Sequence, residues 1–544
     1  MRVARWMLLG CLIAATPAHA QTRTEVYDGA FRDAQMATGS RTALALSRSA
    51  ARLAAGDPEL AQLIRTRQDA SEAAGRAESA EVAARTAQSP DPAAIARATQ
   101  AAAAARAALA AADAALSARS PGYVQLTGIA PVPVAEAQAL LAPDEAIVMI
   151  HSTPTHSYIF AVTRTQADWA RADIGAEALA GEVRALRNAL DPSGALRAGE
   201  DASGDVRTTS ASGFPRARAH ALYTRLWAPI ERIVGKATNV YVVTGGALGG
   251  LPLAVLPTRA PRGSDADPAA MRRTEWLVRR HALVTLPSVG SLRALRAGQA
   301  RGGASRPFVG FGDPALDGAP SLAAPRSFTA FAAVDGDVSA RVKALPRLPG
   351  SKSELDALAR ILGAGPDSVV TGAEATERAV ETAALGDVAV VAFATHGLLA
   401  GEIGPAAEPA LVLTPPAQSV PGGDDGLLTA SEAAQLKMSA DWIILSACNT
   451  AASDGTASGE GLSGLARGFF SAGARAILAS HWRVRDDVAQ ALTVGTLERW
   501  RADPAVGRAT ALRAAMLAMI DDRSHPERAD PALWAPFVIA GEGR

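Results

Sequence analysis

Short apolar runs separated by turn signals follow one another along the chain from about residue 121 onwards. Amphipathic segments alternate with them, at 352–363, 374–384, 429–436, 461–472, 486–499 and 508–520. The runs with the length and side-chain content of strands are Ala146–Ile150, Tyr158–Val162, Val240–Val243, Ala282–Leu286, Phe308–Phe311, Val388–Phe393, Leu411–Leu413, Trp442–Leu445 and Ala476–Ala479. This pattern predicts an α/β domain.

The strand runs also indicate how the sheet is covered. Val388–Phe393, for example, shows no polar alternation. Strands of this kind are buried on both faces of a largely parallel sheet, with helices packed over them. Two stretches rich in loop-forming residues, 191–215 and 312–350, interrupt the pattern. We expect both to be exposed, and the first to be the place where a protease would nick the chain.

The segment 22–119 has a different pattern. It is rich in Ala, Arg, Glu and Gln, and it is interrupted by Gly56-Asp57-Pro58 and Ser89-Pro90-Asp91-Pro92. These are stop and start signals for helices, so the segment predicts three long helices. No clear 34-residue repeat is visible, which leaves an Ala-rich helical bundle or a degenerate repeat region. A structural role and the binding of a regulatory protein both remain open for it.

Residues 1–20 have the order of a signal peptide. Arg2 and Arg5 precede an apolar run at 6–15, and Ala18-His19-Ala20 supplies the small residues of a cleavage site. We therefore expect export to the periplasm or the medium. A lipoprotein signal ending at Cys11 is the alternative, although its apolar run would have only about five residues.

Composition narrows the function further. The 544 residues are 49% hydrophobic, which suits a globular protein of more than one domain. Lys and Arg together number 54, as do Asp and Glu, so nothing indicates nucleic acid as a partner. After the signal peptide no stretch reaches the roughly 18 uninterrupted apolar residues of a membrane span. We therefore expect no membrane-spanning segment.

Cysteine is the residue type whose count changes the picture. The chain has two, Cys11 and Cys448. Removal of the signal peptide leaves Cys448 as the sole thiol, which cannot form an internal disulfide. A lone thiol in an oxidising compartment is either buried and inert or kept for chemistry.

Two of the predicted strands run into reactive residues. Val388–Phe393 leads to His396, and Trp442–Leu445 leads to Cys448. The carboxyl ends of neighbouring parallel strands meet at one edge of a sheet, about 5–10 Å apart. A thiol with a pKa of about 8.5 needs a nearby histidine to become an efficient nucleophile at neutral pH. The spacing therefore predicts a Cys448–His396 dyad, with packed structural roles for both residues as the alternative.

The sequence resembles the CHAT peptidases, a family of caspase-like domains associated with tetratricopeptide repeats. The resemblance covers about residues 121–544. The motifs that carry it occur in the family's order and are Phe393-Ala394-Thr395-His396-Gly397, Asp425-Gly426-Leu427-Leu428-Thr429-Ala430, Leu445-Ser446-Ala447-Cys448-Asn449-Thr450, Gly461 to Ala474 and Trp534-Ala535-Pro536-Phe537.

The resemblance implies a caspase-haemoglobinase-like fold, in which a mostly parallel sheet is flanked by helices and preceded by the helical segment. It implies a pseudo-caspase-like half at 121–300 and a catalytic half at 301–544. His396 and Cys448 would form the dyad, and the N–H groups of Gly397 and Cys448 would form the oxyanion hole. The implied activity is that of a cysteine peptidase that cleaves a protein or peptide substrate through a thioester. A catalytically silent scaffold that binds a protein partner is the alternative.

The sequence departs from related patterns at two places. The caspase motif Gln-Ala-Cys-x-Gly is replaced here by Ser446-Ala447-Cys448-Asn449-Thr450, which argues against caspase specificity. His481 stands where the family commonly has a leucine. It is either a packed structural residue or a second base.

Loop residues near the dyad suggest a substrate preference. Glu402, Asp424, Asp425 and Glu460 form a candidate specificity pocket for Arg or Lys. Gly459-Glu460-Gly461-Leu462-Ser463-Gly464 fits a dinucleotide-binding fingerprint, but it lies eleven residues beyond Cys448, whereas the fingerprint follows its strand directly. His and Cys do not form a paired metal-binding set. We expect no cofactor and no metal.

Overall fold

The computed structural model describes residues 23–38, 63, 66–67, 69–70, 73–74, 77, 80, 91–119, 131–191, 213–297, 304–318, 338–399, 408–416, 424–447, 450–451, 463–482 and 484–544. The predicted signal peptide lies outside them. So do residues 192–212 of the first loop-rich stretch, residues 319–337 of the second, and most of residues 39–90. The described part of the second stretch is not the exposed loop that was predicted, because it contains a helix at Val338–Lys343 and Asp313, Val342 and Leu348 are buried. The predictions for the parts outside the described residues, and the division at residue 300, stay predictions.

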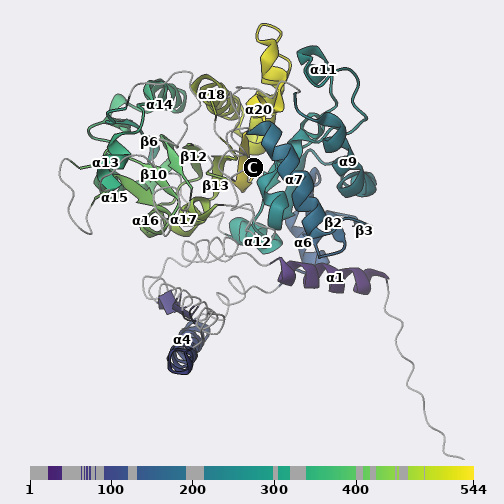
Figure 1. Ribbon diagram of the computed structural model, residues 1–544, viewed down its shortest axis with the longest axis horizontal. Helices are drawn as coiled ribbons and strands as arrows, with labels where there is room; N and C mark the ends of the chain where they lie inside the picture. The colour runs from purple at the N-terminus through teal and green to yellow at the C-terminus, as the bar shows by residue number, and fades with distance from the viewer. Residues whose placement is uncertain are drawn as a thin grey trace, which may run out of the picture.

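One mixed sheet of eleven strands organises the described residues (Figure 1). Its order is β3-β2-β1-β4-β5-β14-β13-β12-β8-β6-β7. The strands are β1 (Glu145–Ser152), β2 (Ser157–Thr163), β3 (Ala167–Ala172), β4 (Asn239–Thr244), β5 (Ala282–Thr285), β6 (Arg306–Pro314), β7 (Val369–Gly372), β8 (Val388–Ala394), β12 (Trp442–Ser446), β13 (Ala476–Ser480) and β14 (Phe537–Gly541).

Most neighbouring strands of this sheet run parallel. The antiparallel pairs are β1 with β2, β2 with β3, and β13 with β14. The last strand, β14, lies in the middle, parallel to β5 and antiparallel to β13. It therefore joins the strands before residue 300 to those after it. The predicted α/β architecture, with a mostly parallel sheet, is confirmed.

A smaller sheet follows β8 directly. Its strands, in the order β11-β10-β9, are β9 (Gly397–Leu398), β10 (Ala410–Val412) and β11 (Leu427–Thr429). It pairs Gly397 with Leu411, and Leu411 with Leu428. The run predicted at 411–413 is thus a strand of this sheet and not of the large one.

Helices cover the large sheet, and Figure 1 shows α14 and α18 on one side of the β6–β12 region and α16 and α17 on the other. The helices of the first half are α6 (Val134–Leu140), α7 (Ala176–Leu190), α9 (Arg216–Leu226), α10 (Glu231–Val234), α11 (Pro268–Arg272) and α12 (Val289–Ala297). Those of the second half are α13 (Val338–Lys343), α14 (Pro349–Leu362), α15 (Glu377–Thr382), α16 (Ala430–Gln435), α17 (Gly464–Ala472), α18 (Asp486–Ala502), α19 (Arg508–Ile520) and α20 (Pro531–Trp534). Each helix predicted beyond residue 350 has a counterpart among them.

Aromatic packing fixes the strand that leads to the candidate site. The ring of Phe393 on β8 stacks on Phe311 of β6, with centroids 5.5 Å apart, and lies 5.3 Å from Phe469 of α17. Phe311 and Phe393 are almost fully buried. A close-packed interior of this kind tolerates little movement, so the carboxyl end of β8 has a fixed position.

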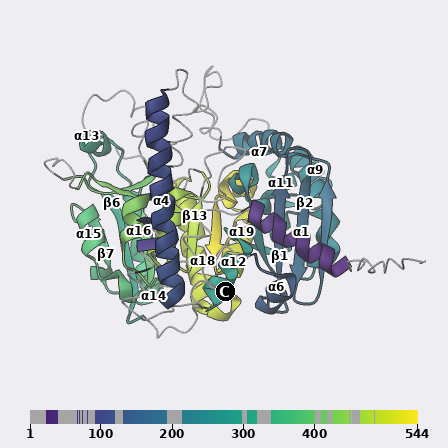
Figure 2. The same ribbon diagram turned by 90° about the horizontal axis from the view of Figure 1, so that it is seen from below.

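Two long helices of the N-terminal segment are described, α1 (Arg23–Ala37) and α4 (Pro92–Arg119). In Figure 2, α1 lies across the part of the molecule that contains β1 and β2. Phe31 and Tyr27 pack against Phe160 of β2, and the Tyr27 hydroxyl donates to the Ala161 carbonyl at 3.2 Å. The first helix is therefore attached to the sheet domain. No described helix has the length and apolarity needed to cross a membrane.

Candidate active site

The two strands that end in the predicted dyad are direct neighbours. β8 and β12 pair in parallel, with Phe393 opposite Leu445 and Ala394 opposite Ser446. His396 follows Ala394 by two residues, as Cys448 follows Ser446. The predicted adjacency of the strands is confirmed. Cys448 and Asn449 lie outside the described residues, so the dyad itself stays a prediction.

The chain turns from the large sheet into the small one at His396. The Thr395 hydroxyl donates to the Val412 carbonyl at 2.5 Å, and the Val412 N–H donates to the His396 carbonyl at 2.9 Å. Gly397 then begins β9. Hydrogen bonds on both sides of the turn hold the His396 backbone at the carboxyl edge of the sheet.

The His396 side chain is buried, and one of its nitrogens has a defined role. Its Nε2 lies 2.7 Å from the Pro346 carbonyl oxygen. A carbonyl oxygen can only accept, so Nε2 carries the hydrogen. In the neutral imidazole this leaves the lone pair on Nδ1, which is the form that a general base needs.

The segment that supplies this carbonyl is itself held in place. Arg347, the next residue, forms an ion pair with Asp313 at 2.9 Å. Asp313 is buried at the end of β6 and has a φ of 39°, in the left-handed region that residues other than glycine seldom adopt. We interpret the Arg347–Asp313 ion pair as a contact that holds the Pro346 carbonyl next to His396. The sequence did not reveal it, because a carbonyl acceptor has no residue-type signature.

Hydroxyl groups fix the chain on both sides of Cys448. The Ala447 carbonyl accepts from Ser480 Oγ at 2.6 Å and from Thr450 Oγ1 at 3.2 Å. The Ser480 N–H donates to Thr450 Oγ1 at 3.0 Å, and the Ala451 N–H donates to the Ser480 carbonyl at 2.7 Å. The end of β13 thus holds the residues that flank the predicted nucleophile.

Removal of one of these hydroxyls should lower the reactivity of Cys448, the predicted nucleophile, without unfolding the protein. In Ser480→Ala the Ala447 carbonyl keeps the Thr450 hydroxyl, so the loss is about 1 kcal/mol of stability. We expect alkylation of Cys448 to slow about tenfold with an unchanged pH midpoint, measured by mass spectrometry. Ser480→Thr keeps the hydroxyl and should restore the rate. An unchanged rate in Ser480→Ala would show that this contact does not position the thiol.

A buried glutamate ties the end of β12 to the helices above it. Glu354 of α14 accepts from Ser446 Oγ at 3.0 Å and from Thr493 Oγ1 of α18 at 2.7 Å. A small polar cavity of about 20 Å³ lies beside Glu354, Ser446 and Ala447. A space of this size holds about one water molecule.

The structure describes part of each remaining predicted group. Gly397, predicted for the oxyanion hole, is buried next to His396, whereas Cys448, its predicted partner, is not described. Asp424 and Asp425 are described, but Glu402 and Glu460 are not. Within the described ranges no group of three or more His, Cys, Asp and Glu is arranged to hold a metal ion.

Asp424 and Asp425 belong to a larger acidic cluster with Glu377 of α15 and Glu432 of α16. The Asp425 N–H donates to Glu377 Oε2 at 3.3 Å. Burial, assisted by the charges of Glu432, Asp424 and Asp425, raises the pKa of Glu377 to about 8. Burial also raises the pKa of Asp425. Among the described residues no Lys or Arg pairs with these four, so the cluster holds negative charge without a counter-ion.

His481 lies immediately after Ser480 and is buried. Its pKa is lowered to about 3, first by burial and then by the nearby charge of Arg187. A histidine with this pKa is a poor proton acceptor at neutral pH. The structure therefore favours the packed role over that of a second base.

Comparisons with known proteins were made for the whole chain. A family model described as the CHAT domain matches residues 216–542. A search of curated proteins finds no match. Among solved structures, the separase–securin complex of Saccharomyces cerevisiae has a TM-score of 0.42 at 8% identity, and the match covers 77% of this chain but 31% of that one. The Arg-specific cysteine proteinase gingipain R has a TM-score of 0.34 at 11% identity, covering 60% of this chain and 67% of the other.

The match to the family model spans more than half of the chain and includes His396, Gly397 and Cys448. It begins at residue 216, later than the start of the resemblance seen in the sequence motifs. The mostly parallel sheet with helices on both faces is the fold that this resemblance predicted, so the caspase-like fold class is confirmed. The chain belongs to the CHAT domain family.

Proposed function

We propose that the protein is an exported, caspase-like cysteine endopeptidase. Cys448 is the nucleophile and His396 the general base. The observation that carries the proposal is the parallel pairing of β8 with β12, in which Ala394 lies opposite Ser446. Because each reactive residue follows its strand by two positions, this register supports an imidazole within reach of the thiol.

The chemistry follows from the tautomer of His396. Nε2 donates to the Pro346 carbonyl, so Nδ1 is the nitrogen that takes the proton from the Cys448 thiol. The thiolate attacks the peptide carbonyl carbon, and the oxyanion forms facing the N–H groups of Gly397 and Cys448. The imidazolium then protonates the leaving amine as the C–N bond breaks. Water hydrolyses the thioester and regenerates the thiol.

The acidic cluster supports a preference for a basic residue before the cut. Glu377, Asp424, Asp425 and Glu432 lie together near β11, in the small sheet that begins directly after His396. A Lys or Arg side chain would supply the cation that this cluster lacks. Glu402 and Glu460, which lie outside the described residues, stay part of the predicted specificity pocket.

Regulation by a second protein is part of the proposal. The segment 22–119 supplies α1, which is attached to β2, and α4, which Figure 1 shows away from the sheet. A partner bound to this segment could therefore act on the domain through α1.

Digestion of a peptide library with the purified mature protein tests the proposal. We expect cleavage after Arg or Lys, and none with Cys448→Ala. Cleavage that persists in Cys448→Ala would exclude Cys448 as the nucleophile. If the wild-type protein cleaves nothing, the silent scaffold is the better account, and a preference for acidic residues before the cut would refute the role of the acidic cluster.

A further inference from the structure

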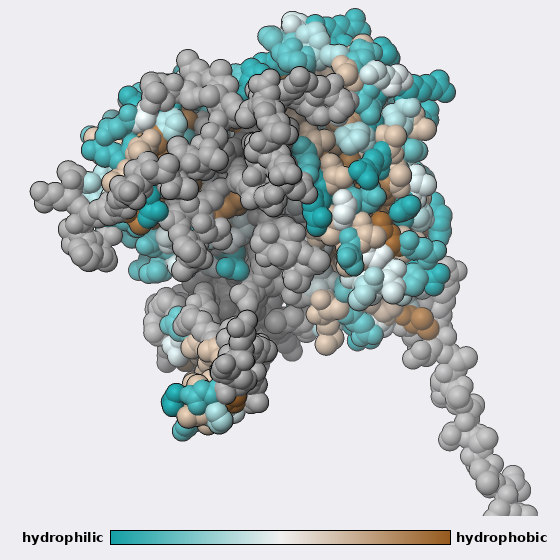
Figure 3. Space-filling view, viewed as in Figure 1, coloured by the Kyte–Doolittle hydropathy of each residue, from teal (hydrophilic) through white to brown (hydrophobic). Residues whose placement is uncertain are grey.

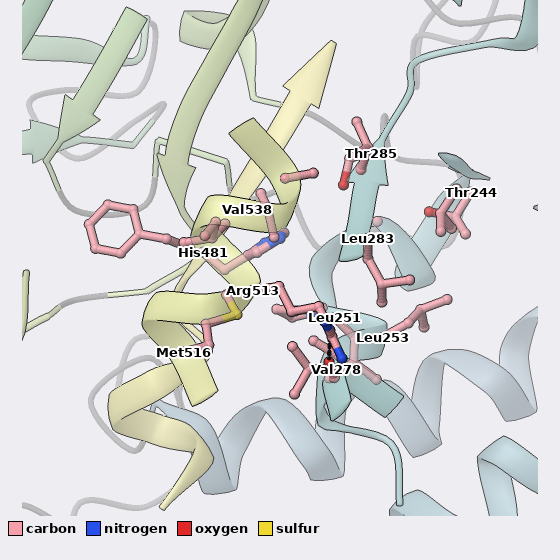
Figure 4. A pocket seen from close by; sticks show the side chains of 18 of the residues that line it. Thr244, Leu251, Leu253, Val278, Leu283, Thr285, His481, Arg513, Met516 and Val538 are labelled. Carbon is pink, nitrogen blue, oxygen red and sulfur yellow. Dashed lines mark hydrogen bonds between the residues drawn. The ribbon is translucent and has the colours of Figure 1, made fainter. Parts of the chain in front are cut away.

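An apolar cavity of about 50 Å³ lies on the opposite side of β13 from the candidate active site, between β4, β5 and α19 (Figure 4). Leu248, Leu251, Leu253, Leu283 and Met516 form much of its wall. Figure 4 shows His481 at one side of this space, on the segment that follows β13, and Leu283 and Thr285 of β5 at another. Leu251, Pro252 and Leu253 thus line this cavity from one continuous segment, which has no part in the proposed chemistry.

His481 introduces a polar group into these apolar surroundings. Its backbone is fixed, because its N–H donates to the Pro536 carbonyl at 2.8 Å and its carbonyl accepts from Arg187 Nη2 at 3.0 Å. The side chain is 3% exposed, and its Nδ1 has no hydrogen-bond partner among the residues that the structure describes. A buried polar atom without a partner destabilises a protein, so this one calls for an explanation.

Histidine is an unusual residue type for the wall of an apolar cavity. A leucine here would suit an apolar wall without any partner. The imidazole is neutral, since burial and the charge of Arg187 lower its pKa to about 3. A neutral imidazole carries one N–H donor and one acceptor nitrogen. This chain has therefore placed a neutral hydrogen-bonding group on the wall of an apolar cavity.

Among the described residues that line this cavity, the one charged side chain is Arg513, and it is engaged elsewhere. Arg513 of α19 donates from Nε to the Val278 carbonyl at 2.7 Å and from Nη2 to the Arg279 carbonyl. Its positive charge disfavours a cationic ligand. An anionic ligand is disfavoured as well. Two of the three side-chain nitrogens of Arg513 already donate to these carbonyls, and the mainly apolar wall cannot compensate an anion for the loss of its hydration.

We propose that this cavity binds a small, uncharged, mainly apolar molecule with one hydroxyl group, which pairs with the His481 imidazole. The cavity volume is below the roughly 150 Å³ of an engineered cavity that binds benzene. The cavity must therefore widen to admit a ligand as large as benzene. The hydrogen bond to His481 favours a hydroxyl compound over a hydrocarbon of the same shape. The proposal does not rest on peptidase activity. His481, on the cavity wall, directly follows Ser480, whose hydroxyl donates to the Ala447 carbonyl.

Phenol and benzene form a matched pair of probes, because they differ by the hydroxyl alone. The full mature chain, labelled with ¹⁵N in its histidines, is titrated with each while the ring nitrogen resonances are followed. His481→Leu identifies the resonance of His481. We expect phenol to shift that resonance, to raise the melting temperature, and to bind about tenfold more tightly than benzene. In His481→Leu the affinity for phenol should fall to that for benzene, and the protein without ligand should melt higher than the wild type.

A second variant keeps the imidazole and fills the space. Ala254→Met places a longer side chain at the cavity wall, and a circular dichroism spectrum checks that the variant is folded. It should abolish binding of both probes. The proposal is overturned if phenol does not bind, if it binds wild type and His481→Leu equally, or if folded Ala254→Met binds phenol as tightly as the wild type.

Discussion

His396→Ala should slow peptide hydrolysis by about 10² to 10⁴-fold, the usual contribution of a general acid–base group. Alkylation of Cys448 by iodoacetamide at pH 7 should slow about tenfold or more. Without the imidazole the thiol returns towards its ordinary pKa of about 8.5, at which only a few per cent is thiolate. The alkylation rate is followed from pH 5 to pH 10 by mass spectrometry. We expect the midpoint to lie below 8.5 in the wild type and near 8.5 in the variant.

A matched control separates the loss of this base from the loss of any histidine. His156 lies between β1 and β2, where its Nε2 faces Asp173 at 3.6 Å, on the far half of the large sheet. His156→Ala should leave both the rate and the midpoint unchanged. If the alkylation rate of Cys448 and its pH midpoint are the same in the wild type and His396→Ala, the dyad is contradicted and the catalytically silent scaffold is favoured. This holds whatever the result with His156→Ala.

The main strands at the site were predictable because their runs are unusually uniform. Val388–Phe393 and Trp442–Leu445 contain no charge, which is the mark of strands buried on both faces. The central strand β14 was not predicted from the sequence, and its pairing with β5 and β13 is what identifies Phe537–Gly541 as a strand. The edge strand β3 was not predicted either. Its residues are mostly half-buried or exposed, and Trp169 is 41% exposed.

The described surface adds little to the prediction of the fold or of the candidate site. On the face shown in Figure 3 the region over α9 and α11 is mainly hydrophilic. Among the described residues, the exposed large apolar side chains are Val26 and Met36 of α1, Trp169 of β3, and Val506. Single exposed apolar side chains are normal on soluble domains.

The parts of the site that the sequence did not reveal depend on tertiary contacts. The Pro346 carbonyl contacts His396, and the Ser480 hydroxyl contacts the Ala447 carbonyl. Neither contact can be predicted from the residue types, because the fold alone brings the partners together. Asp424 and Asp425 were recognisable in the sequence as acidic loop residues near the predicted dyad. Glu377 lies almost fifty residues upstream on α15, and only the packing of that helix brings it to Asp425. Its raised pKa could not be foreseen without that contact.

Glu377 should make the protein less stable as the pH rises. Its pKa is about 8 in the folded protein but about 4.3 in an unfolded chain. Between these values the folded state retains a proton that the unfolded state has lost, so the free energy of unfolding falls as the pH rises through this window. Glu377→Gln removes this titration and keeps an oxygen for the Asp425 N–H. We expect the variant to match the wild type near pH 5 and to exceed it at pH 9 by about 1–2 kcal/mol, since solvent screens part of the shift.

Urea unfolding at pH 5, 7 and 9 measures this difference, and Glu498→Gln is its matched control. Glu498 is exposed on α18, so its substitution removes one charge without changing the acidic cluster and should give a curve parallel to that of the wild type. If Glu377→Gln is no more stable than the wild type at pH 9, the cluster does not hold uncompensated charge. The argument for a basic residue in the substrate would then lose its support, while the assignment of His396 and Cys448 would stand, because it rests on the pairing of β8 with β12.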